Sequence, residues 1–245
     1  MTRRRAFLVC AFTLFVVLAT HRVQAGGPWQ LEGGGYGGST TGHMACGSDV
    51  RVSYAGLGGE LRYAEAVAAQ DRSGFGFELG GATQAQTEHA INCAGAACSP
   101  PADGVLPFGR VRVGYDWRDF GFRIGALALT KVDAGRIEGL PFPDVDIRVG
   151  EIDGLRFVLG LGAYDLPTYA LPGLYMGLTV PTGHGWEVGG HLGWHVSLSD
   201  VGGGRESITL TAPLLEHLWA RTDFALMENQ YGPGSDVIIG LGGDF

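Results

Sequence analysis

The chain has 245 residues, 43 of them glycine, and carries 25 acidic residues against 17 lysines and arginines, a net charge of −8. A chain this acidic lacks the basic surface that phosphate backbones require, so we expect no nucleic-acid partner. The glycines follow no collagen period and therefore need a structural reason within a folded domain.

The first 25 residues have the pattern of a secretory signal peptide. Three arginines precede an apolar run from Phe7 to Ala19, and Val-Gln-Ala ends the segment, which predicts cleavage after Ala25. The signal holds four of the 17 basic residues, so the exported chain keeps 13 against 25 acidic ones, a net charge of −12. No later segment is apolar over the roughly 18 residues that a membrane helix needs.

Residues 26–47 follow the signal and include the glycine-rich stretch GGPWQLEGGGYGGSTTGH. We interpret this segment as either a flexible leader in the periplasm or a plug that folds into the domain formed by residues 48–245.

The stretch GWEVGGHLGWHVSLSD, residues 185–200, carries two histidines four residues apart, a spacing that on a helix would suit a shared zinc ion. Its glycines make a helix improbable, and alternation by two predicts a strand instead. In a strand, His191 and His195 are separated by roughly 13 Å at about 3.3 Å per residue, too far for one metal. We therefore predict no metal site, and no other motif predicts a cofactor.

The same alternation recurs along the chain, with one apolar face and one small or polar face in each segment. In a soluble sandwich the apolar face would be core, whereas in an outer-membrane barrel it meets lipid and the polar face meets the lumen. We predict about twelve strands, with ten possible, near residues 49–57, 60–70, 73–88, 108–118, 120–130, 144–151, 154–164, 173–181, 185–199, 205–213, 217–228 and 235–245. Glu65 falls on the apolar phase of its segment, so that strand bends there or has a different register.

Connections between these segments alternate in length, being short after even-numbered strands and mostly longer after odd-numbered ones. This is the asymmetry of periplasmic turns and outer loops. Aromatic side chains gather beside the short turns and predict a girdle at the membrane boundary, formed by Tyr115, Trp117, Phe120, Phe122, Trp186 and Phe245, with Trp219 in the same zone.

The last predicted strand ends in Phe245, with Leu241, Ile239 and Val237 on the same face and Gly243 between them. This pattern resembles the assembly signal of Gram-negative outer-membrane β-barrel proteins, and the resemblance covers about residues 48–245. It implies an all-β, closed antiparallel up-and-down transmembrane barrel located in the cell outer membrane. It also implies contact with outer-membrane lipid and recognition by the barrel-assembly machinery through the last strand. It implies neither an activity nor an oligomeric state.

Charged residues occupy several positions that would face the lumen. Two interpretations remain open: the charges pair across strands, or they line a polar pore and set its selectivity. The predicted lumen-lining residues are Arg112, Arg123, Arg148, Arg156, Glu187, His191, His195, Arg221 and Asp223.

We predict a non-enzymatic barrel, either structural or a passive pore for small solutes, and keep two alternatives. One is a soluble secreted all-β binding module, favoured by the short segments 144–151 and 205–213, the latter ending at Pro213. The other is an outer-membrane lipid hydrolase, because His195 and Ser197 resemble the catalytic pair of outer-membrane phospholipase A and lipid A deacylase. The Asn that follows the serine in those families is Leu198 here, and His195 would face the lumen.

Three cysteines remain after the signal peptide, an odd number for an oxidising compartment. Cys93 and Cys98 are close enough in sequence to close a small surface loop, so we predict a disulfide between them, while the pairing of Cys46 stays open.

Overall fold

The computed structural model describes residues 27–43, 49–92, 104–133, 136–151, 154–164, 173–195, 203–229 and 232–245. Within these ranges the chain forms twelve strands and one short helix, and no helix there is long and apolar enough to cross a membrane. The predicted signal peptide, the three cysteines of the exported chain and Ser197 lie outside the described residues.

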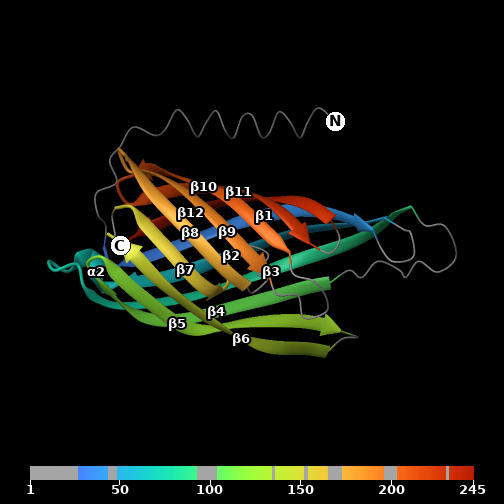
Figure 1. The fold of residues 1–245 in the computed structure, drawn as a ribbon, viewed down its shortest axis with the longest axis horizontal. Helices are drawn as coiled ribbons and strands as arrows, with labels where there is room; N and C mark the ends of the chain where they lie inside the picture. The colour runs from blue at the N-terminus through green and yellow to red at the C-terminus, as the bar shows by residue number, and fades with distance from the viewer. Residues whose placement is uncertain are drawn as a thin grey trace.

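The strands form one closed antiparallel barrel in which each strand pairs with its neighbours in the chain and the first pairs with the last (Figure 1). The prediction of a closed up-and-down barrel of about twelve strands is confirmed. The strands are β1 (Trp29–His43), β2 (Asp49–Ala64), β3 (Gly74–Asn92), β4 (Gly104–Trp117), β5 (Phe120–Asp133), β6 (Arg136–Gly150), β7 (Arg156–Gly162), β8 (Gly173–Gly183), β9 (Trp186–His195), β10 (Gly204–Leu215), β11 (Leu218–Asn229) and β12 (Gly232–Asp244).

Strand β1 corrects the interpretation of residues 26–47 as a leader or plug. Residues 29–43 form part of the barrel wall, where Gly34 pairs with Gly240 of β12 on one side and with Gly58 of β2 on the other. Glycines on both faces of β1 hide the period of two in the sequence, although Leu31 points outward and Tyr36 inward. The predicted number of strands is still twelve. The segments predicted as two strands, 49–57 and 60–70, belong largely to one strand, β2, and β1 is the additional strand.

The end of β2 explains why Glu65 lies on an apolar phase in the sequence. The strand stops at Ala64, and helix α2 (Glu65–Ala68) begins the turn toward β3. The Glu65 carboxylate then accepts a hydrogen bond from the Phe75 backbone N–H at 2.9 Å. The residue caps a turn outside the strand and does not face lipid.

The barrel wall is apolar outside and polar inside, the reverse of a soluble protein. Of the described residues, 31 large apolar side chains are exposed, while 16 polar or charged residues are buried. Strand β4 shows the alternation, since Val111, Val113 and Tyr115 are exposed and the intervening Arg112 and Asp116 are buried. Among the described residues no second sheet packs on the apolar side.

The two segments that favoured a soluble module are longer than the sequence pattern predicted. Strand β6 has 15 residues and β10 has 12, which exceed the 9–11 residues that a membrane-spanning strand requires. The β10–β11 pairing tolerates Pro213 through a shift in register between Pro213 and Leu215. The lengths of these two strands therefore no longer favour a soluble module.

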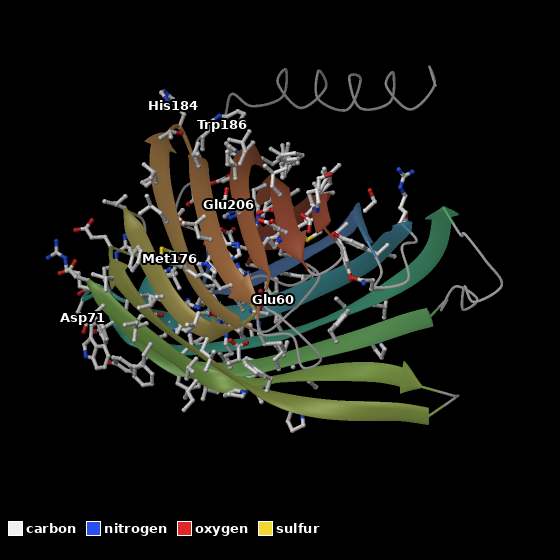
Figure 2. All side chains as sticks on the ribbon, turned by 45° about the vertical axis from the view of Figure 1, so that its right-hand side comes forward. Glu60, Asp71, Met176, His184, Trp186 and Glu206 are labelled. Carbon is white, nitrogen blue, oxygen red and sulfur yellow. The ribbon has the colours of Figure 1, made fainter. Side chains whose placement is uncertain are left out.

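One end of the barrel, here called the turn end, holds the connections that follow the even-numbered strands. Figure 2 shows Asp71 of the β2–β3 turn and His184 of the β8–β9 turn at this end. The opposite end, the loop end, carries the connections that follow odd-numbered strands. The predicted difference in length holds only in part, because β5 and β6 are also joined by a short connection, residues 134–135.

Candidate functional site in the barrel lumen

The outer surface near the turn end carries the predicted aromatic side chains. Trp117 lies 4.9 Å from Tyr115, 5.8 Å from Phe120 and 6.1 Å from Phe122, measured between ring centroids. These four rings and Phe245 are exposed on the apolar face, and Trp186 is half-buried in the same outward phase.

Trp219 differs from this group because it is on the lumen side. It pairs with Gly242, and a Cβ added to Gly242 would overlap the indole ring. The expectation that Trp219 belongs to the girdle is therefore wrong.

Among the described residues, eight arginines of the lumen form ion pairs with eight carboxylates, so these groups carry no net charge. The arginines are Arg62, Arg110, Arg112, Arg123, Arg148, Arg156, Arg205 and Arg221, and the carboxylates are Glu32, Glu60, Glu78, Asp116, Asp144, Asp146, Asp223 and Asp236. These sixteen groups offer no excess of either sign to a permeating ion.

Arg112 is the centre of the network on the β3–β6 wall. Its guanidinium donates to Glu78, to Asp146 at 2.6 Å and to the Tyr175 hydroxyl at 3.3 Å. Arg148 donates to the same two carboxylates, at 2.8 Å to Glu78 and 2.7 Å to Asp146. The contact from Arg112 on β4 to Tyr175 on β8 joins strands that are four places apart around the barrel, so it crosses the lumen.

Closer to the turn end, Asp116 forms ion pairs with two further arginines. Arg123 donates to it at 2.5 Å and Arg156 at 3.4 Å. The Arg123 guanidinium lies above Gly76, where an added Cβ would overlap it. Inward glycines thus provide the space in which long side chains pack, which accounts for part of the high glycine content.

Arg110 connects the wall to a segment that leaves it. The side chain is fully buried and pairs with Glu60 of β2, while its Nη1 donates to the carbonyl of Ala163 at 2.7 Å and to that of Tyr164 at 3.4 Å. These two residues follow the end of β7 at Gly162, which has a φ of +133°, a backbone conformation that glycine adopts without strain. We call Gly162–Tyr164 the inward segment.

The Tyr164 ring extends from the inward segment across β8 to β9. It stacks on His191 with a centroid distance of 4.3 Å and an interplanar angle of 10°, and it meets Tyr175 edge-on at 5.5 Å. It also covers Gly177 of β8, where an added Cβ would overlap the ring.

The opposite side of the lumen is joined through Arg205 of β10. It donates to Asp236 at 3.1 Å and to Asp223 at 3.1 Å, and its Nη1 lies 3.3 Å from His191 Nδ1. Tyr54 of β2 donates to Asp236 at 3.3 Å. Together with Arg110 and Tyr164, these contacts form a circuit around the inside of the barrel that starts at Glu60 and returns to Tyr54, both on β2.

Apolar clusters also fill part of the lumen, which the alternation did not predict. One cluster consists of Tyr36, Tyr54, Ala82, Met227 and Ile238. A second consists of Leu127 and Ala163, with Phe142 packed against it and Phe108 packed against both clusters. Side chains along a water-filled channel would be accessible to solvent, yet those of both clusters' cores are at most 6% exposed.

The structure brings most of the predicted lumen residues together. Arg112, Arg123, His191 and Asp223 are buried inside the barrel, and Arg148, Arg156 and Arg221 are partly buried in the same network. Glu187 is exposed near the turn end, away from this centre. His195 ends β9, and its side chain lies outside the described residues.

The predicted set of lumen-lining residues omitted several residues that carry the network, including Glu60, Glu78, Arg110, Tyr164 and Arg205. The alternation by two could have placed Glu60, Glu78 and Arg110 inside the barrel. Arg110 shares the inward phase of Arg112, and Glu60 directly precedes Leu61, which is in the outward phase. No such rule could find Tyr164, which lies beyond the end of its strand.

A serine and a histidine do meet in the lumen, but they are not the pair that the sequence suggested. Ser207 Oγ lies 3.4 Å from His191 Nδ1. The Arg205 guanidinium also donates to this nitrogen, the atom that would have to accept the serine proton. The pair faces the inside of the wall and the apolar surface is outside.

No protein-family model and no curated protein sequence matches this chain. Among solved structures, the chain is similar to the translocator domain of the autotransporter NalP from Neisseria meningitidis, with 8% identity, a TM-score of 0.49, and 99% of this chain and 97% of that chain covered.

It is also similar to the beta domain of the Bordetella autotransporter BrkA, with 12% identity, a TM-score of 0.43, and 91% and 100% covered. A third likeness is to a deletion mutant of the monoaromatic hydrocarbon channel TodX, with 10% identity, a TM-score of 0.45, and 89% and 90% covered. All three TM-scores are below 0.5.

Proposed function

We propose that this protein is an integral outer-membrane barrel without enzymatic activity, whose lumen is closed to solutes by its own side chains. The membrane assignment is supported by the exposed apolar band, because an antiparallel barrel with apolar residues outside and charges inside suits a lipid environment. The export signal and the C-terminal pattern of the sequence support the outer membrane as its location.

The main support for a closed lumen is the circuit of contacts inside the barrel. This circuit runs through Glu60, Arg110, Tyr164, His191, Arg205, Asp236 and Tyr54. Its members are buried, apart from the half-buried Tyr164. Buried charges that are paired and hydrogen-bonded form a rigid filling, whereas a pore lining would keep them hydrated. This favours a structural barrel over a continuously open passive pore.

The test is a planar-bilayer recording on protein refolded into lipid. We expect insertion without stepwise conductance, because buried ion pairs and apolar clusters fill the lumen in the described part of the chain. Recovery of the protein only in the detergent-extracted membrane fraction tests the location independently. Continuous conductance at insertion would contradict the closed lumen, and recovery without detergent would contradict the membrane assignment.

We also propose that the last strand is what the barrel-assembly machinery recognises. Val237, Ile239 and Leu241 point outward on β12, and the exposed Phe245 closes the same row. The Phe245 N–H donates to the Trp29 carbonyl at 3.0 Å, so this end of the row adjoins β1. Phe245→Ser should lower the amount of folded barrel in cells. Refolding of the purified variant into detergent should be nearly unchanged, which separates recognition from stability.

A further inference from the structure

We propose that the inward segment Gly162–Tyr164 is a gate, and that its displacement converts the closed barrel into a pore for small hydrophilic solutes of either charge. This inference rests on the proposed function, since it requires a membrane barrel that is closed at rest.

The inward segment differs from the other parts of the circuit because only its first residue, Gly162, pairs with a neighbouring strand. Glu60, Arg110, His191, Arg205 and Asp236 all belong to strands that pair on both sides. Moving the backbone of any of these requires breaking ladder hydrogen bonds. Ala163 and Tyr164 follow Gly162, the last paired residue of β7, so their backbone can move without breaking a β7–β8 pair.

The inward segment takes part in three separate sets of contacts inside the lumen. The carbonyls of Ala163 and Tyr164 accept from Arg110, the Ala163 side chain belongs to the apolar cluster with Leu127, and the Tyr164 ring stacks on His191. Removing the segment therefore breaks the circuit at its link between β4 and β9 and also opens the apolar cluster.

The groups left behind remain attached to the walls. Arg110 keeps Glu60 as a partner, and Arg205 keeps Asp223 and Asp236. A path opened in this way would be bordered by paired charges of both signs. Weak selectivity between cations and anions follows, because selectivity requires an excess of one sign along the path.

Gly177 offers a way to displace the ring without altering any charge. An added Cβ there would overlap the Tyr164 ring, so Gly177→Val should expel the ring from its position on His191. Gly190→Val is the matched control. Gly190 lies on the neighbouring strand β9 in the outward phase, and the nearest atom to an added Cβ is the Ser207 carbonyl oxygen at 3.8 Å.

The experiment compares single-barrel conductance of the wild type, Gly177→Val, Tyr164→Ala and Gly190→Val in planar bilayers. We expect the open fraction to rise about tenfold in Gly177→Val and Tyr164→Ala, which corresponds to about 1.4 kcal/mol. We expect the wild type and Gly190→Val to stay closed. A gradient of potassium chloride should give a reversal potential near zero in the open variants.

Migration as a folded band in unheated gels identifies variants that have kept the barrel. If Gly177→Val does not fold, Tyr164→Ala still tests the gate, because it removes the ring without crowding. Folded variants that remain closed would overturn the gate and leave the closed barrel intact. A wild type that conducts on insertion would instead overturn the proposed function.

Discussion

The lumen is filled in two different ways on its two sides. The β3–β6 wall packs arginines against carboxylates, with Arg112 shared by Glu78 and Asp146. The seam formed by β12, β1 and β2 carries an apolar cluster that includes Tyr36, Tyr54 and Ile238, beside the paired carboxylates Glu32, Glu60 and Asp236. The first side depends on charges being paired, and the second depends on space that glycines leave. The two sides should therefore respond differently to mutation.

The largest effect is expected from Arg112→Ala on the charged wall. Removing one partner leaves buried carboxylates with less compensation, a change that typically costs about 3–5 kcal/mol. The free energy of unfolding in urea, followed by tryptophan fluorescence in lipid or detergent, measures it. Arg118→Ala is the control, because Arg118 and its partner Glu151 are both exposed and their side chains are 3.6 Å apart. Equal losses in the two variants would contradict the role of burial.

A smaller effect is expected at the seam, where two adjacent glycines of β1 face opposite sides. A Cβ on the inward Gly34 would lie 2.7 Å from Gly240 Cα, so Gly34→Ala should destabilise the barrel by about 1–3 kcal/mol. A Cβ on the outward Gly35 finds its nearest atom at 3.5 Å, on the Leu57 side chain, so Gly35→Ala should change stability by less than about 0.5 kcal/mol. The urea midpoints of the two variants decide this, and reversed order would refute the assigned facing of β1.

The smallest effect is expected from Tyr54→Phe, which removes one hydroxyl from the seam. The hydrogen bond to Asp236 is lost while the ring remains packed, so the cost should be about 1 kcal/mol. Tyr115→Phe on the outer surface provides the comparison and should be nearly neutral. A loss for Tyr54→Phe as large as that for Arg112→Ala would mean that the seam also depends on charge pairing.

The alternation of residues predicted the barrel and much of its inner surface. Arg112 and Arg123 could be placed inside because each lies between outward apolar residues on a clear strand. The same rule failed for β1, where glycine occupies both faces and leaves too few side chains to show a period. It also set the wrong start for the barrel domain, which includes β1 (Trp29–His43).

The partners within the lumen could not be predicted from the sequence. Arg112 and Tyr175 meet although 63 residues separate them, because the curvature of the barrel brings β4 and β8 together. The inward segment depends on a backbone turn at Gly162, and the sequence contains many glycines that make no such turn. Local patterns specify which side of the wall a residue faces, while the closed geometry specifies what it meets.

The pairing of β1 with β12 joins Gln30 to Asp244, residues more than 200 positions apart. A sheet that grows from β1 through β2 toward β12 therefore carries unpaired backbone groups at both margins until the last strand joins the first. Such margins attract other chains, and contacts between remote positions form slowly. An incomplete barrel thus needs protection from aggregation, and the pairing of β1 with β12 ends that need.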